Sequence, residues 1–215
     1  MSQALQTNVQ KTYGQVEATW FELASRTAKV LIVRQDMRYR EVAAALTEMG
    51  VQESSRSLEG KIHRGTFPFS FFLQLIVATK SYRPLEWREA LEAEQSWQHR
   101  ASSIIQRDMA AQRWLTYNVL SRQLRDIGVI VSPPALHYKF RDGTLSAALF
   151  LQYATIRRLE CVSGWVCWPD LNEVAAEGGR FFEAGDPVLV EPPGTPAPYR
   201  RWTRRWTWKR RPAPR

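Results

Sequence analysis

The chain has 215 residues, of which 30 are basic and 21 are acidic, and 44% of its residues are hydrophobic. This length and apolar content predict a folded protein of one or two domains and exclude a collagen-like chain, a disulfide-stabilised scaffold and a wholly disordered chain. No stretch approaches the ~18 to 20 apolar residues of a membrane-spanning helix, and the N-terminus lacks the basic and then apolar pattern of a signal peptide. We therefore expect a cytoplasmic protein.

The net charge of +9 is concentrated at the C-terminus. Residues 200–215 carry eight basic side chains and no acidic one, which leaves residues 1–199 with a net charge of only +1. The high overall charge therefore favours an anionic partner for the tail and says little about the rest of the chain.

Helical periodicity dominates the first 160 residues. Apolar residues recur at helical spacing along residues 16–35 and predict a first helix that ends near Gln35. Three shorter helices are expected to follow as far as residue 80. Their predicted boundaries are residues that end or cap helices, namely Gly50, Ser54, Gly65 and Pro68.

An internal repeat is the clearest feature of the sequence. Residues 46–78 align without a gap on residues 124–156 at an offset of 78, and eleven of the 33 positions are identical. Chance would give roughly two identities. The identical residues include the glycines that end helices and the serines that cap them, so both copies are expected to fold alike. Weaker apolar matches such as Leu31/Met109 extend each unit back into its first helix.

The repeat suggests a division of the chain into five parts. Residues 85–128 contain no proline, and the first glycine among them is Gly128. This predicts continuous helix with one break. Short β-branched and aromatic stretches after residue 160 predict two or three short strands. The predicted fold is mainly α, with helical unit 1 at 15–80, a linker helix at 81–96, helical unit 2 at 97–160, a small partly extended segment at 161–191 and a disordered basic tail at 192–215.

Each unit has the pattern of a helix-turn-helix. A helix that ends in glycine, a short turn and a short capped helix place the second helix where it can enter the major groove of DNA. In the first copy this is helix 54–64, which Leu58 and Ile62 anchor. The candidate DNA-binding residues on the outward sides of the two helices are Arg56, Ser57, Lys61, Arg64, Lys139 and Arg141.

The sequence leaves two functions open. A DNA-binding protein that regulates transcription or a mobile element is the first interpretation. The second is a non-enzymatic protein-interaction adaptor that uses the same helices, because Glu59 and Asp142 oppose a position next to phosphates. Since Pro134, Ala135 and Asp142 replace donor residues of the first copy, we expect the first copy to contact bases and the second to be mainly architectural.

A short signature in the first copy resembles a known family. It follows the pattern K-I-x-R-G-x-F-x3-F-F-x-Q, carried by Lys61, Ile62, Arg64, Gly65, Phe67, Phe71, Phe72 and Gln74. This resembles a small bacterial domain family of unknown function that is similar to the phage-repressor type of helix-turn-helix. The second copy departs from the signature at Asp142 and Leu145. The resemblance implies a fold and not an activity.

The tail interleaves cations with tryptophans. Its candidate residues for sequence-independent nucleic-acid binding are Arg200, Arg201, Trp202, Arg204, Arg205, Trp206, Trp208, Lys209, Arg210 and Arg211. An anionic membrane surface, which attracts the same composition, is the less favoured partner. A functionally neutral extension is the remaining interpretation.

No pattern typical of an enzyme occurs in the sequence. The three histidines are scattered, and there is no glycine-rich phosphate loop or nucleophile elbow. Cys161 and Cys167 lack a nearby histidine and are expected to be small apolar fillers. We therefore predict no catalytic residues, no metal and no cofactor.

Overall fold

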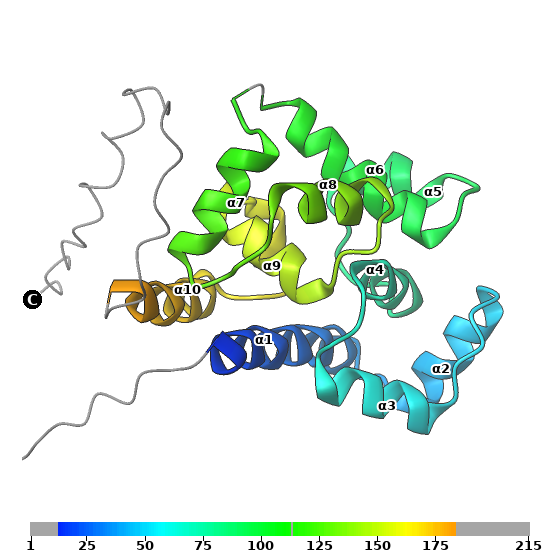
Figure 1. Ribbon diagram of the computed structural model, residues 1–215. Helices are drawn as coiled ribbons and strands as arrows, with labels where there is room; N and C mark the ends of the chain where they lie inside the picture. Colours follow the sequence, from blue (N-terminus) through cyan, green and yellow to red (C-terminus); the bar gives the residue numbers. More distant parts are fainter. Residues whose placement is uncertain (1–12, 113, 184–215) are drawn as a thin grey trace, which may run out of the picture. The chain divides into compact units, whose positions relative to one another are not determined.

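The computed structural model describes residues 13–112 and 114–183 (Figure 1). These residues form helices and turns and no β-strand, which confirms the predicted mainly α class. In chain order the helices, with 3-10 helices marked η, are α1 (Tyr13–Arg34), α2 (Tyr39–Glu48), α3 (Ser55–Arg64), α4 (Phe69–Ala78), η1 (Leu85–Trp87), α5 (Arg88–Glu92), α6 (Trp97–Ala110), α7 (Tyr117–Asp126), α8 (Pro133–Arg141), α9 (Ala147–Arg157), η2 (Glu160–Gly164) and α10 (Trp168–Glu183).

The two copies of the repeat have the same order of helices. α2, α3 and α4 begin at Tyr39, Ser55 and Phe69, and α7, α8 and α9 each begin 78 residues later. The structure therefore confirms the internal repeat. The predicted caps are also present, because Gly50, Gly65, Gly128 and Gly143 all have positive φ angles.

The alignment of the first helices is shifted by one residue from the predicted one. The Cα of Gly65 lies against the carbonyl group of Phe21 on α1, and that of Gly143 lies against the carbonyl group of Gln98 on α6. Phe21 and Gln98 are 77 residues apart, whereas the glycines are 78 apart. The match of Leu31 to Met109 is therefore wrong by one position, because the chain from Gln98 to the start of α7 is one residue longer than the chain from Phe21 to the start of α2.

An approximate two-fold axis relates the copies. The backbone N–H of Phe69 donates to the carbonyl of Leu145 at 2.8 Å, and the N–H of Ala147 donates to the carbonyl of Phe67 at 2.9 Å. Phe67 and Leu145 are equivalent positions, as are Phe69 and Ala147, so the two hydrogen bonds exchange when the copies are exchanged. The helices follow the same rule, since α1 packs against α9 and α6 packs against α4.

The core of the protein lies where the copies meet. The ring centroids of Phe72 and Trp165 are 5.6 Å apart, and those of the equivalent pair, Phe150 and Trp87, are also 5.6 Å apart. Trp87 and Trp165 lie 5.2 Å from each other and are themselves separated by 78 residues. The repeat thus extends beyond α4 and α9, and each copy contributes half of one aromatic core.

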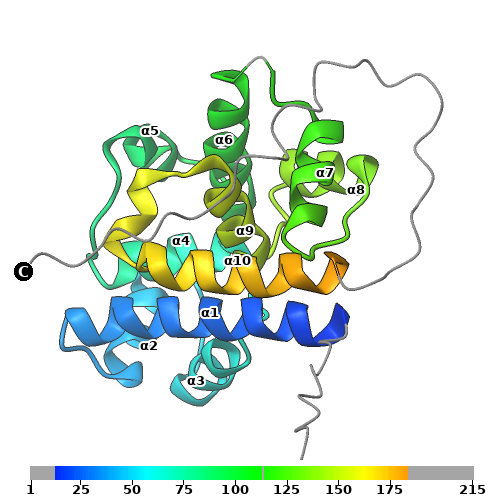
Figure 2. The ribbon, with the colours of Figure 1, turned by 90° about the vertical axis from the view of Figure 1, so that its left-hand side faces the viewer.

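The predicted strands after residue 160 are absent up to residue 183, where η2 and α10 occur instead. Leu171, Val174 and Ala175 are buried at helical and not at alternating spacing, and α10 packs against α1, α9 and α7. Figure 2 shows α10 alongside α1 over most of its length. Burial of an apolar stripe against three helices outweighs the strand preference of the β-branched residues.

The helix at 81–96 is shorter than the linker helix that the sequence predicts. Only η1 and the short α5 form there, and Ala93 adopts an extended conformation. Ser96 then caps α6 by accepting a hydrogen bond from the backbone N–H of His99. A second interruption follows α6, so the stretch expected to have one break has two. The predicted disordered tail at 192–215 lies outside the described residues.

Candidate nucleic-acid interface

Helix α3 is a short helix that packs against its neighbours on one side only. The side chain of Ser54 accepts from the backbone N–H of Ser57 at 3.1 Å, and Gly65 ends the helix in the left-handed conformation. Leu58 and Ile62 are fully buried between α3 and its neighbours α1 and α2. One capped end, one glycine end and two apolar anchors leave the opposite side of α3 free for other contacts.

Five of its outward side chains are polar and exposed: Arg56, Ser57, Glu59, His63 and Arg64. Among the described residues, no ion pair involves Arg56 or Arg64. These two guanidinium groups are therefore available to an anionic partner.

The shared lysine of the first copy has an internal role. The ammonium group of Lys61 pairs with the carboxylate of Glu53, which is almost buried, and lies 4.7 Å from the ring centre of Phe71. Burial opposes ionisation of Glu53, but hydrogen bonds from Lys61 and Ser57 outweigh it and lower the pKa of Glu53. Lys61 thus ties α3 to the preceding turn and to α4.

Lys139 has different surroundings, although it occupies the equivalent position. Val131 replaces Glu53 and Leu149 replaces Phe71, so neither partner exists in the second copy. Lys139 is exposed and takes part in no ion pair among the described residues.

The cation of Arg141 is balanced locally. Its guanidinium donates to the carboxylate of Asp142 at 2.8 Å and lies 5.1 Å from the ring centre of Tyr138. Asp142 stands where the first copy has Arg64. The end of α8 is therefore less cationic than the end of α3.

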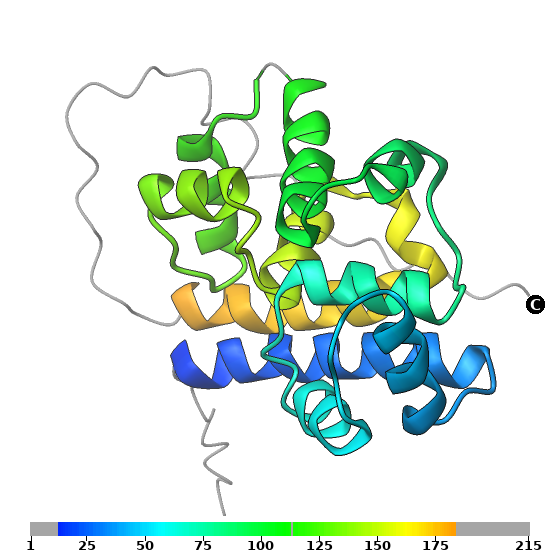
Figure 3. The same cartoon turned by 90° about the vertical axis from the view of Figure 1, so that its right-hand side faces the viewer.

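The six candidate residues of the two copies do not form one surface. Helix α3 lies below the α1 and α10 pair, and α8 lies above it, in all three views (Figures 1, 2 and 3). The candidates divide into an α3 group and an α8 group. The tail candidates, from Arg200 to Arg211, lie outside the described residues.

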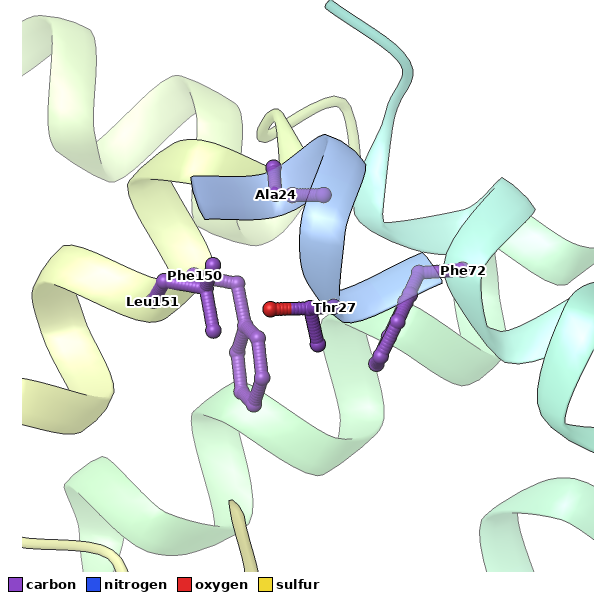
Figure 4. Close-up of a pocket in the computed structure, with 6 residues that line it drawn as sticks. Ala24, Thr27, Phe72, Phe150 and Leu151 are labelled. Carbon is purple, nitrogen blue, oxygen red and sulfur yellow. The ribbon is translucent and has the colours of Figure 1, made fainter. Parts of the chain in front are cut away.

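A small gap between the two copies is a packing defect. Ala24, Thr27, Phe72, Ala147, Phe150 and Leu151 line it (Figure 4), and it has no room for a water molecule. Ala147 stands where the first copy has the much larger Phe69. The gap therefore reflects a difference in size between equivalent residues.

The described residues form no candidate metal centre, and the thiol of Cys161 is not a reactive one. No group of three or more histidine, cysteine, aspartate or glutamate side chains there could hold a metal ion. Burial, with the negative charges of Glu86 and Asp108, raises the pKa of the Cys161 thiol to about 12. In the same part of the chain, no helix combines the length and apolarity needed to cross a bilayer.

Comparison with known families identifies the repeat. One family model, described as a domain of unknown function (DUF6471), matches the chain twice, at residues 20–83 and 97–161. The chain belongs to the DUF6471 family. Its two DUF6471 matches begin at Trp20 and Trp97, which are 77 residues apart, in agreement with the contacts of Gly65 and Gly143. No curated protein and no solved structure matches the chain.

Sequence reasoning missed the partner of Lys61. Glu53 directly precedes the capping Ser54 and lies eight residues before Lys61, so no helical spacing links the two charges. Two signals were available in retrospect, namely a carboxylate next to a helix cap and its loss to Val131 in the second copy.

We expect Glu53→Gln to destabilise the protein by about 1 kcal/mol near neutral pH, because it removes a charge-assisted hydrogen bond to Lys61. The folded-state pKa of Glu53 lies below its ordinary value of 4.5. The contribution is therefore complete above about pH 4.5 and disappears as the pH falls through the folded-state pKa. Urea unfolding near pH 7 and near pH 3 measures this difference.

Glu59→Gln is the matched control, since Glu59 is exposed on the same helix. It should change the free energy of unfolding little at either pH. An equal loss of stability for Glu53→Gln at both pH values would contradict the role of its charge.

Proposed function

We propose that the protein binds double-stranded DNA through α3, in the control of transcription or of a mobile element. The turn between α2 and α3 and the capped second helix are what a helix-turn-helix requires. The observation that carries the proposal is the exposed side of α3, where Arg56 and Arg64 take part in no ion pair within the described residues. Arginine is the side chain best suited to guanine edges and phosphates.

Lys61 has a supporting role in this proposal. Because it pairs with Glu53 and covers Phe71, it fixes the orientation of α3. Direct contacts to DNA then come from Arg56, Ser57 and Arg64, with Lys139 and Arg141 in a separate group. This favours the first copy as the one that contacts bases.

The tail has a different part in the proposal. Its eight cations and three tryptophans favour sequence-independent attachment to nucleic acid, which depends steeply on salt. Replacement of the tail cations by serine should therefore flatten the dependence of affinity on salt concentration. A change in α3 should alter the preference between DNA sequences and leave that slope largely intact.

The proposal predicts the effect of single substitutions in α3. The full chain is used to recover fragments of genomic DNA, and affinity for a recovered duplex is then compared with that for an unrelated duplex. We expect Arg56→Ala or Arg64→Ala to reduce specific binding by about 1 to 3 kcal/mol, because each removes a bidentate donor. Arg141→Ala should cost less, since Arg141 is paired with Asp142.

Arg88→Ala is the matched control, because it removes one exposed arginine from α5. It should leave the preference between the two duplexes unchanged. If Arg56→Ala and Arg88→Ala behave alike, α3 is not the DNA-binding helix.

A protein-interaction adaptor is the second candidate function. The observation that favours it is the charge of the α2 and α3 region, because residues 39–64 carry four basic and four acidic side chains. A neutral surface gains little from the release of counterions around DNA. Failure of the full chain to enrich any DNA fragment would support this candidate.

A further inference from the structure

Helix α8 exposes a stripe of rings and an arginine. Pro134, His137, Tyr138 and Arg141 are spaced at i, i+3, i+4 and i+7, so they share one face of the helix. All four are exposed, and 56% of the surface of Tyr138 is accessible. The ring of Tyr138 is therefore open to solvent in the middle of this stripe.

The side chains of this stripe are positioned by contacts with each other and with the core. The ring centroids of His137 and Tyr138 are 5.8 Å apart, and Arg141 covers Tyr138. On the inner side, the ring of Tyr117 lies 5.2 Å from that of His137 and 6.1 Å from that of the buried Phe140. The exposed rings therefore lose little additional freedom when they bind a flat partner.

The surroundings of the stripe are more cationic than those of α3. Residues 117–142 carry four basic and two acidic side chains, whereas the equivalent residues 39–64 carry four of each. Lys139 lies next to Tyr138 and forms no ion pair with any described residue. The stripe thus combines rings with a local excess of positive charge.

We propose that the α8 stripe binds single-stranded nucleic acid. Unpaired bases stack on Tyr138 and His137, while Lys139 contacts the phosphates. Bases in a duplex have no free faces for such stacking, so this site is separate from the duplex contact proposed for α3. The neighbouring Lys139 favours a nucleic-acid strand over a protein segment, because lysine is depleted from protein interfaces.

The equivalent stripe of α3 supports this assignment. It consists of Arg56, Glu59, Gly60 and His63, so Gly60 stands where α8 has Tyr138. The first copy therefore has no ring at the central position, and the acidic Glu59 lies next to that position. The stacking surface is a property of the second copy alone.

The test uses a fluorescent oligothymidylate and a full-length chain whose eight tail cations are replaced by serine, so that the tail does not mask the site. Tyr138→Ala is expected to weaken binding about five- to a hundredfold, the usual effect of removing one stacking ring. Tyr138→Phe keeps the ring and should bind like the parent chain. A bromodeoxyuridine-containing strand should cross-link, on irradiation, to a peptide that contains α8.

Tyr82→Ala is the matched control, because Tyr82 has almost the same exposure, 57%, in another part of the structure. It should leave oligothymidylate binding unchanged. Equal affinities of the parent chain and Tyr138→Ala, or cross-links confined to other peptides, would overturn the proposal and favour a protein partner for α8. Duplex binding that depends on Arg56 and not on Tyr138 would separate this site from that of α3.

Discussion

Replacement of Gly65 by alanine is expected to destabilise the protein by more than about 4 kcal/mol. A Cβ atom at this position would lie 1.8 Å from the backbone carbonyl oxygen of Phe21, far inside van der Waals contact. The φ angle of Gly65 is also +68°, which disfavours any side chain. Because the obstructing atom belongs to the backbone of α1, α3 would have to move away from α1. Chemical denaturation, monitored by circular dichroism, measures the loss.

The structure supplies both a replicate and a control for this prediction. At Gly143 a Cβ atom would lie 1.8 Å from the carbonyl oxygen of Gln98, so Gly143→Ala should be as damaging. Gly50 has a φ of +79° but no atom within 4 Å of its added Cβ. Gly50→Ala should therefore cost only the conformational strain of about 1 to 2 kcal/mol. Equal effects at Gly50 and Gly65 would show that α3 does not approach α1 as closely as described.

Trp165→Ala should destabilise the protein by about 3 to 5 kcal/mol, because it leaves a large cavity in the aromatic core. The ring of Trp165 is almost fully buried and contacts Phe72, Tyr82 and Trp87. Its indole N–H also donates to the backbone carbonyl of Tyr82 at 3.1 Å. Thermal and urea unfolding would report the change in stability.

A double-mutant cycle with Trp87→Ala tests whether the two copies share this core. Because the two rings are in contact, the loss of stability in the double mutant should differ from the sum of the two single-mutant losses by about 0.5 kcal/mol or more. Trp114→Ala is the control, since 50% of Trp114 is exposed and its loss should have little effect. Strict additivity of Trp87→Ala and Trp165→Ala would contradict a common core.

Local signals in the sequence predicted the helices around the candidate interface well. As helix caps, Ser54, Gly65 and Gly143 act through neighbouring backbone groups, so their capping roles follow from a few adjacent residues. The burial of Leu58 and Leu136 follows equally from helical spacing. These features could be predicted because they do not depend on distant parts of the chain.

Features that depend on distant contacts could not be predicted in this way. The strand-like composition after residue 160 gave the wrong structure, because α1 and α9 offer α10 an apolar surface that the local sequence does not reveal. The pairing of Lys61 with Glu53 and the contact of Trp87 with Trp165 likewise require knowledge of the folded chain. Of the candidate site, the exposure of Arg56 and Arg64 was predictable, whereas the internal role of Lys61 was not.

The exchange of contacts across the two-fold axis also determines how the halves assemble. In a dimer of separate identical chains, the two equivalent positions beside the axis would hold the same residue. Here the first copy has Phe69 at this position and the second copy has Ala147. The stacked rings of Phe69 and Phe150 have their centroids 4.0 Å apart. Two identical halves would form this contact twice, whereas this protein forms it once. A covalent connection keeps the halves at a high effective concentration and in a fixed one-to-one ratio. Each half can therefore change its outer surface without losing its partner.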